Sequence, residues 1–233
     1  MNNWIAAALT LAICIVWLRA MDFTAHRGWV DSRLSRKIIH IGTGPIFVLC
    51  WLMFGDGNEA RWLAAAIPGL ITVQFALIGL GIVKDEASVR AMSRSGDRLE
   101  ILRGPLFYGI MFVVLTIAFW KDSPIGMTAL MLMCGGDGIA DVVGRRLASP
   151  KLPWNRGKSV LGTVSVLVGG FLMTFFILWI YVSVRVMPGP LSGYLTPVAI
   201  LSLTAAAVES LPYRDIDNLT VTMAVVLVGF LLF

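Results

Sequence analysis

The chain has 233 residues, of which 58% are hydrophobic and only 14% are charged, and its mean hydropathy is +0.82. Because a soluble domain carries about a quarter charged residues, this composition excludes an ordinary soluble enzyme and indicates an integral membrane protein. The net charge is +5, but the sequence contains no soluble domain on which the basic residues could form one face, so nucleic-acid binding is not expected.

Apolar segments follow one another along the whole chain, at residues 3–18, 38–54, 62–83, 105–120, 124–144, 160–184, 195–211 and 219–233. Most approach the ~20 residues that a helix needs to cross the hydrocarbon core. The segments 38–54 and 124–144 fit least well, because they are short or polar. An open sheet could not satisfy its backbone in lipid. The sequence therefore predicts an all-α fold, a polytopic helical membrane bundle of about 7–8 transmembrane helices that forms one domain over residues 1–233.

Connecting segments that are rich in Lys and Arg alternate with segments that are poor in them. Five of them lie in each of the segments 19–37, 84–103 and 145–158, and the two intervening segments contain one each. The positive-inside rule therefore predicts that the three basic segments face the cytoplasm and that both termini lie outside. We expect a multi-pass protein of the inner cell membrane. Tryptophans near the predicted outer ends of the spans are expected to form an aromatic belt: Trp4, Trp51, Trp62 and Trp120.

The stretch CGGDGIADVVGRR (134–146) ends an apolar segment with two acids, Asp137 and Asp141. A charge inside the bilayer costs roughly 2.5–3.5 kcal/mol on insertion scales, so the pair calls for an explanation. Four residues apart, the acids share one helix face and could hold Mg²⁺, which prefers oxygen ligands. The glycines, Gly138 among them, would let a backbone or a phosphate approach closely. The alternative is a structural pairing with Arg145, Arg146 or a cation of another span. The mutual repulsion of two close acids favours the metal.

The segment RRLASPKLPWNRGKS, which we term the basic loop (145–159), has five basic residues and no acid. Such a loop suits phosphate groups at the cytoplasmic face. It is not a P-loop, because Leu152 stands where that motif needs glycine and no strand precedes it. Alternatively, these basic residues only set the topology and contact anionic lipid, which would explain their number. This alternative explains less well why Lys158 and Ser159 lie at the start of a span. Solvent at that span end is expected to accommodate the loss of Lys158 without unfolding.

Further polar residues lie at the same predicted end of other spans. Lys37 and His40 are three residues apart and so share a helix face, although a lone histidine at a membrane boundary is as often a structural group. Glu209 closes a span of small residues, and the acidic stretch YRDIDNLT (213–220) follows it. The ionisable groups therefore gather at the cytoplasmic end, where nucleotides are found.

Seven stretches, in this order, resemble the polyprenol kinase family, which includes phytol, farnesol and dolichol kinases and a CTP-dependent diacylglycerol kinase. They are SRKIIHIGTG, ARWLAA, LRGPLFY, SPIGM, CGGDGIADVVGRR, KS followed by GT, and VESLP followed by DN. Together they run from about residue 35 to 220, which is most of the chain. The branch that the chain resembles most is that of the phytol and farnesol kinases.

The resemblance implies a membrane enzyme that moves the γ-phosphate of CTP onto the hydroxyl of an isoprenoid alcohol, such as phytol, and releases CDP. It implies Mg²⁺ as cofactor, with Asp137 and Asp141 as its ligands. The catalytic residues it implies are Lys37, His40, Asp141 and Glu209. The nucleotide-binding residues it implies are Gly138, Arg145, Arg146, Lys151, Lys158, Ser159, Asp217 and Asn218. Glu100 is a further polar position of the family.

The chain departs from the family pattern at Ile216, where an acid is usual and which Asp215 could replace. Two other functions stay open. A membrane cytidylyltransferase would also use CTP, Mg²⁺ and lipid, but it would attach CMP and release pyrophosphate. An ion-coupled transporter would use the acids as a relay, although the chain lacks the paired interrupted half-helices typical of one. The expected partners are the lipid alcohol, the nucleotide and membrane lipids, and the sequence is compatible with a homo-oligomer.

Overall fold

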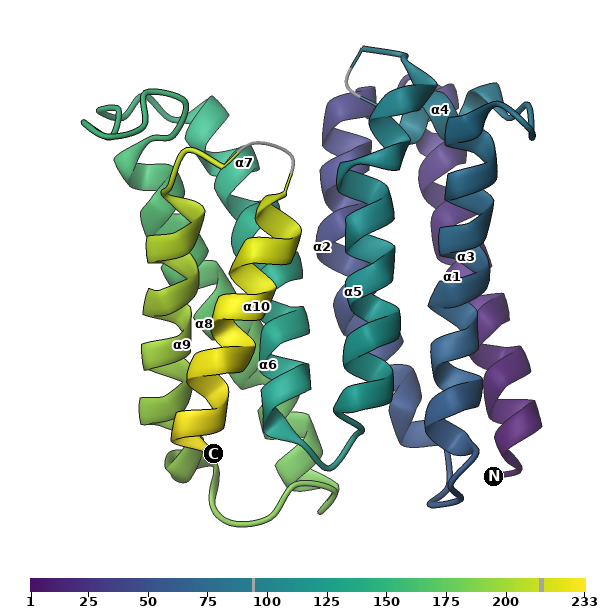
Figure 1. Ribbon diagram of the computed structural model, residues 1–233, viewed down its shortest axis with the longest axis vertical. Coiled ribbons are helices and arrows are strands. Elements are labelled where there is room, and N and C mark those ends of the chain that lie inside the picture. The colour runs from purple at the N-terminus through teal and green to yellow at the C-terminus, as the bar shows by residue number, and fades with distance from the viewer. Residues whose placement is uncertain (94, 214–215) are drawn as a thin grey trace. The chain divides into compact units, whose positions relative to one another are not determined.

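The computed structural model describes residues 1–93, 95–213 and 216–233, with the side chains at 26, 32, 33 and 145 left out. Within these residues all regular structure is helical, apart from one isolated antiparallel bridge between Lys151 and Ser159. The predicted all-α fold is confirmed. The chain forms two compact units, which we call the N-terminal unit (Met1–Ile117) and the C-terminal unit (Ala118–Phe233), and each is described by itself (Figure 1).

The N-terminal unit contains α1 (Asn3–His26), α2 (Ser32–Cys50), η1 (Trp51–Met53), α3 (Ala60–Leu80), α4 (Glu86–Met92), η2 (Arg98–Leu102) and most of α5 (Gly104–Ala118). Side chains cap the starts of its helices as expected for orphan N–H groups: the Asp31 carboxylate accepts from the Leu34 amide at 2.9 Å, and the Asp85 carboxylate from the Ser88 amide at 3.0 Å. The helix α2 begins six residues before the predicted span 38–54, so Lys37 and His40 lie within a helix.

The C-terminal unit contains α6 (Pro124–Met131), η3 (Leu132–Asp137), α7 (Gly138–Arg146), α8 (Val160–Ser183), η4 (Leu191–Tyr194), α9 (Leu195–Glu209) and α10 (Asp217–Leu232). The first three run on as one helix, in which η3 is a π-helical stretch with the sequence LMCGGD. The sequence did not predict this widening. Because π-helical stretches are rare and frequently mark functional sites, the segment that delivers Asp137 is structurally unusual.

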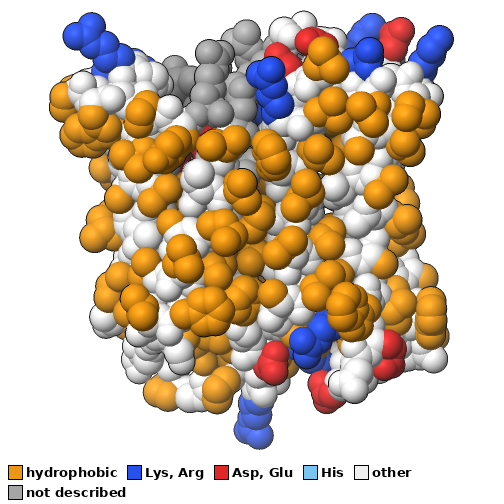
Figure 2. Space-filling view, in the orientation of Figure 1, with side chains coloured by type: hydrophobic (Ala, Val, Ile, Leu, Met, Phe, Trp, Pro, Cys, Tyr) orange, Lys and Arg blue, Asp and Glu red, His pale blue; other side chains and the backbone are white. Residues whose placement is uncertain are grey.

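The helices have the length and composition of membrane spans. Among the described residues, six are long and apolar enough to cross a membrane, and α10 is a shorter apolar helix. The remaining predicted span, α2, carries Arg and Lys in its first turns. Figure 2 shows hydrophobic side chains along the helices and Lys, Arg, Asp and Glu at the helix ends. A polytopic helical membrane protein is therefore confirmed, with the expected count of spans as an approximation.

The expected aromatic belt is only half right. Trp4 and Trp62 are exposed, at 70% and 59%, as lipid-facing anchors would be. Trp51 is fully buried and packs edge-on against Phe47 at 5.8 Å, and Trp120 is also buried. Span-end position alone does not tell an anchor from a core residue, because both are apolar and close to the interface.

Glycines hold the Asp137 helix close to α8. A Cβ at Gly136 would lie 3.0 Å from the Val166 side chain, and one at Gly144 would lie 3.5 Å from the Cα of Gly162. A side chain at either position would require a neighbour to shift: Val166 at Gly136, and the Ser159 hydroxyl, which would be 3.1 Å away, at Gly144. The expected close approach is thus made by a neighbouring helix, and the packing sets the π-helical stretch and α7 beside the start of α8.

Candidate active site

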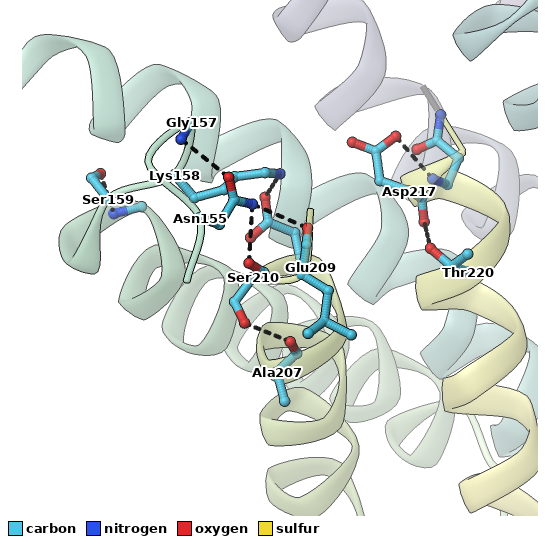
Figure 3. A network of polar contacts seen from close by, with 12 residues as sticks. Asn155, Gly157, Lys158, Ser159, Ala207, Glu209, Ser210, Asp217 and Thr220 are labelled. Atoms are coloured by element: carbon cyan, nitrogen blue, oxygen red, sulfur yellow. Dashed lines mark hydrogen bonds and ion pairs between the residues drawn. The ribbon is translucent and has the colours of Figure 1, made fainter. Parts of the chain in front are cut away.

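Three segments of the C-terminal unit meet at one of its ends: the end of the basic loop, the end of α9 and the start of α10 (Figures 1 and 3). There the Lys158 ammonium donates to Oε1 of Glu209 and forms an ion pair with it. The Lys158 side chain is 26% exposed and that of Glu209 only 3%. A carboxylate this deeply buried needs its cation, because an unpaired buried charge is strongly unfavourable.

Two more carboxylates act on the same lysine. Burial by itself lowers the pKa of Lys158, but attraction to Glu209, and then to Asp137 and Asp217, outweighs burial and raises the pKa above its ordinary value. Carboxylates of the π-helical stretch, of α9 and of α10 therefore all attract the same ammonium, and that of Glu209 pairs with it directly. Lys158 and Glu209 are 51 positions apart in the sequence, so the fold is needed to bring them, with Asp137 and Asp217, to one end of the unit.

Glu209 has a second carboxylate oxygen that is not used by the ion pair. Its Oε2 is buried and has no hydrogen-bond partner among the described residues. A buried acceptor of this kind is uncommon in proteins and calls for an explanation such as a catalytic role or an absent ligand. The ion pair through Oε1 holds the carboxylate in place, and Oε2 is left without a hydrogen bond among the described residues.

Asp137 ends the π-helical stretch, Asp141 lies in α7 of the same continuous helix, and both are half-buried; that they share one face stays a prediction. Among the residues described, no group of three or more His, Cys, Asp or Glu is placed to hold a metal. Mg²⁺ needs no all-protein cage, since it is commonly bound by one or two carboxylates together with phosphate oxygens and waters. The donor set therefore fits Mg²⁺ that arrives with a nucleotide, and the metal remains a prediction.

The other predicted residues of the basic loop lie around Lys158 in the sequence. Ser159 is buried, and its hydroxyl accepts from the Gly162 amide at 3.2 Å as the N-cap of α8. Arg146 and Lys151 are exposed, and the side chain of Arg145 lies outside the described residues. Nucleotide binding by these four residues and by the buried Gly138 stays a prediction.

The start of α10 supplies the last part of the site. Asp217 is half-buried and accepts from the amide of Asn218 at 3.2 Å, while Asn218 itself is buried. Ile216 is exposed and occupies the N-cap position without a capping side chain. Asp215, the residue considered as a replacement for the missing acid, lies outside the described residues.

The other predicted site residues lie in the N-terminal unit. The His40 ring packs on Tyr108 with 4.4 Å between ring centroids, and the Tyr108 hydroxyl donates to the His40 carbonyl at 2.7 Å. Lys37 is half-buried on the same helix. Glu100 accepts from the Ser95 hydroxyl at 2.9 Å. These contacts join α2 to α5 and steady η2, and the catalytic roles implied for Lys37 and His40 stay predictions.

The chain is similar to kinases of isoprenoid alcohols over most of its length. It is 39% identical over 230 residues to a protein of wheat (Triticum aestivum) named probable phytol kinase, covering 98% of this chain and 77% of that protein. Two proteins of Arabidopsis thaliana, phytol kinase 1 and farnesol kinase, are 39% and 41% identical over 209 residues, covering 89% of this chain and 69% and 68% of theirs. The chain belongs to the phytol and farnesol kinase branch of the polyprenol kinases.

Membership confirms the resemblance and makes this kinase a membrane-embedded phosphotransferase. The three relatives carry the word chloroplastic in their names, which describes those proteins, and the inner cell membrane stays a prediction for this one. No model of a known protein family matches the chain, and no solved structure matches it.

Proposed function

We propose that this kinase transfers the γ-phosphate of CTP to the hydroxyl of an isoprenoid alcohol, such as phytol or farnesol, and releases CDP. Family membership supports the reaction class and the alcohol, and the resemblance of the motifs supports the donor. The observation that carries the site is the ion pair between Lys158 and the buried Glu209, with Asp137 and Asp217 around the same ammonium.

In the proposed reaction the alcohol oxygen forms a bond to the γ-phosphorus, and the bond from that phosphorus to the β–γ bridging oxygen breaks. CDP leaves with the electron pair of that bond. The hydroxyl proton moves to a carboxylate, for which we propose Oε2 of Glu209, since this atom is buried and has no other partner among the described residues. A positioned base of this kind contributes typically 10²–10⁴-fold to a rate.

Charge neutralisation is the main task of a protein in phosphoryl transfer. Lys158 is proposed to offer its remaining N–H groups to the phosphates, with the exposed Arg146 and Lys151 attracting the nucleotide. Asp137 and Asp141 would hold Mg²⁺, which would neutralise the β- and γ-phosphate oxygens. The apolar tail of the alcohol would lie among the membrane-spanning helices, with its hydroxyl at the end where Lys158 lies.

Purified protein in detergent, given γ-labelled CTP and a panel of isoprenoid alcohols, tests this proposal. We expect label in the lipid, CDP as the second product, and loss of turnover when Mg²⁺ is chelated. Pyrophosphate in place of CDP would show the cytidylyltransferase reaction instead. A competition series with unlabelled ATP, GTP and UTP measures how far the donor site prefers CTP.

The proposed location is the inner cell membrane, with the site at the cytoplasmic face and both termini outside. The native Cys14, Cys50 and Cys134 are buried, so single cysteines introduced at exposed positions report topology cleanly. In intact cells, an impermeant maleimide is expected to label Asp122→Cys and to leave Ala148→Cys unlabelled until the membrane is opened. External labelling at 148 would overturn the orientation.

A further inference from the structure

One turn of the basic loop is fastened to the end of α9 by a single asparagine. Asn155 donates through Nδ2 to the backbone carbonyls of Ser210 and Leu211, both at 3.1 Å. Its Oδ1 accepts from the Gly157 amide at 3.1 Å. The last carbonyls of a helix have no partners within the helix, and Asn155 satisfies two carbonyls at the end of α9 that lie 55 and 56 residues away in sequence.

The same turn also carries Lys158. The Leu152 amide donates to the Lys158 carbonyl at 3.1 Å, and the Lys158 amide donates to the Asn155 carbonyl at 3.0 Å. Asn155 is three residues before Lys158, and its acceptor Ser210 is the residue after Glu209 (Figure 3). We call Asn155 and its three side-chain hydrogen bonds the clamp. The clamp therefore holds together the two backbone segments from which Lys158 and Glu209 form their ion pair.

The clamp matters because much of the outer side of the turn is in solvent. Pro153, Arg156 and Gly157 are exposed. A lysine side chain loses up to about 2 kcal/mol of rotamer freedom when it is fixed, and this cost is smaller when its backbone is already in place. A second link, from Trp154 Nε1 to the Ser210 hydroxyl, is longer at 3.3 Å, and Trp154 itself is largely exposed.

We infer that Asn155 is a positioning residue for phosphoryl transfer, which sets Lys158 against Glu209 and toward the nucleotide phosphates. The inference rests on the proposed function for its role in catalysis, but the clamp itself does not. Neither the sequence motifs nor the family relationship singled out this residue, and its role follows from its three side-chain hydrogen bonds.

Asn155→Asp tests the clamp with almost no change in size. The carboxylate keeps the acceptor for Gly157 but cannot donate to the two carbonyls, and it repels them. We expect the KM for CTP to rise about tenfold, the equivalent of one or two lost hydrogen bonds, with the KM for the alcohol unchanged. Ser210→Ala is the matched control, because it removes the hydroxyl that Trp154 uses and keeps the carbonyl that Asn155 uses. Its KM for CTP should equal that of the wild type.

A purely structural role would lower the amount of folded enzyme, and hence Vmax, without moving the KM for CTP. Thermal unfolding of each variant measures the folded fraction. Should Asn155→Asp not fold, Asn155→Ser replaces it, since the shorter side chain cannot serve both carbonyls, and the same rise in KM is expected.

A second measurement needs no nucleotide. Trypsin cleaves after Arg156 and Lys158 only when the turn opens, so cleavage in the substrate-free protein follows the opening equilibrium. We expect Asn155→Asp to be cut about tenfold faster there than the wild type or Ser210→Ala. If the wild type did not use CTP, the proposed function would be wrong, but the trypsin cleavage rates would still show whether Asn155 keeps the turn closed. With CTP turnover intact, unchanged cleavage would overturn the clamp, and faster cleavage with an unchanged KM would overturn the positioning role.

Discussion

In both units a side chain from a neighbouring segment donates to backbone carbonyl oxygen at the end of a long helix, but with different surroundings. In the N-terminal unit, Arg98 Nη1 donates to the Gly79 carbonyl near the end of α3 at 2.7 Å. In the C-terminal unit, Asn155 serves the end of α9. Only the second device lies next to a buried carboxylate.

The difference separates a structural cap from a candidate site. The Arg98 side chain lies over Gly81, which ends α3 in the left-handed region with φ of 79°, and is itself exposed. Termination of α3 is sufficient to explain that arrangement. Around Lys158, burial and three carboxylates combine, and a charged group that is both buried and specifically partnered is typical of functional sites.

The largest effects are expected when the buried ion pair between Lys158 and Glu209 is broken. Lys158→Ala leaves Glu209 buried without its cation, so activity should fall by orders of magnitude and stability by about 3 kcal/mol, the lower end of the 3–5 kcal/mol known for buried pairs because Lys158 is partly exposed. This contradicts the sequence-based expectation that solvent at the span end would accommodate the loss. The double variant Lys158→Met with Glu209→Gln removes both charges, and we expect it to regain stability but no activity.

Thermal unfolding and CTP turnover are measured for the single and the double variant and compared. The pH dependence of stability is a further check. Because the folded-state pKa of Lys158 is raised, its contribution to stability is complete below the ordinary lysine value of about 10.4 and is lost as the pH rises through the higher folded value. The stability advantage of the wild type over Lys158→Ala should therefore shrink only in strongly alkaline solution. A double variant as unstable as Lys158→Ala would argue against the buried pair.

The next effects concern the two aspartates of the π-helical stretch and α7. Asp137→Asn and Asp141→Asn keep the shape and a carbonyl oxygen but remove a charge that Mg²⁺ would need. Turnover should fall by orders of magnitude and its Mg²⁺ dependence should weaken, while stability stays the same or rises as repulsion is relieved. Asp122→Asn, on the short connection before α6, is the control. Lost stability with normal turnover in the folded fraction would mean a structural ion pair.

The sequence predicted the helices well and the contacts of the site poorly. Each apolar segment became a helix within a few residues, because length and hydropathy decide that locally. Lys158 and Glu209 were both named as candidate site residues, but their ion pair was not predicted, since it joins residues far apart in the chain. The π-helical stretch depends on backbone packing against α8, and a lone asparagine such as Asn155 carries no pattern at all.

The smallest effect is expected from the cap of the N-terminal unit. Arg98→Met keeps an unbranched apolar side chain but removes the guanidinium that lies over Gly81 and donates to the Gly79 carbonyl. This should lower the free energy of unfolding by about 1 kcal/mol, a typical net value for one hydrogen bond. The KM for CTP should not change, in contrast to Asn155→Asp. Arg90→Met is the control, because its ion pair with Glu86 is 3.7 Å long and fully at the surface, where such pairs contribute little. If Arg98→Met raised the KM for CTP as Asn155→Asp does, the distinction between a structural cap and a positioning clamp would be wrong.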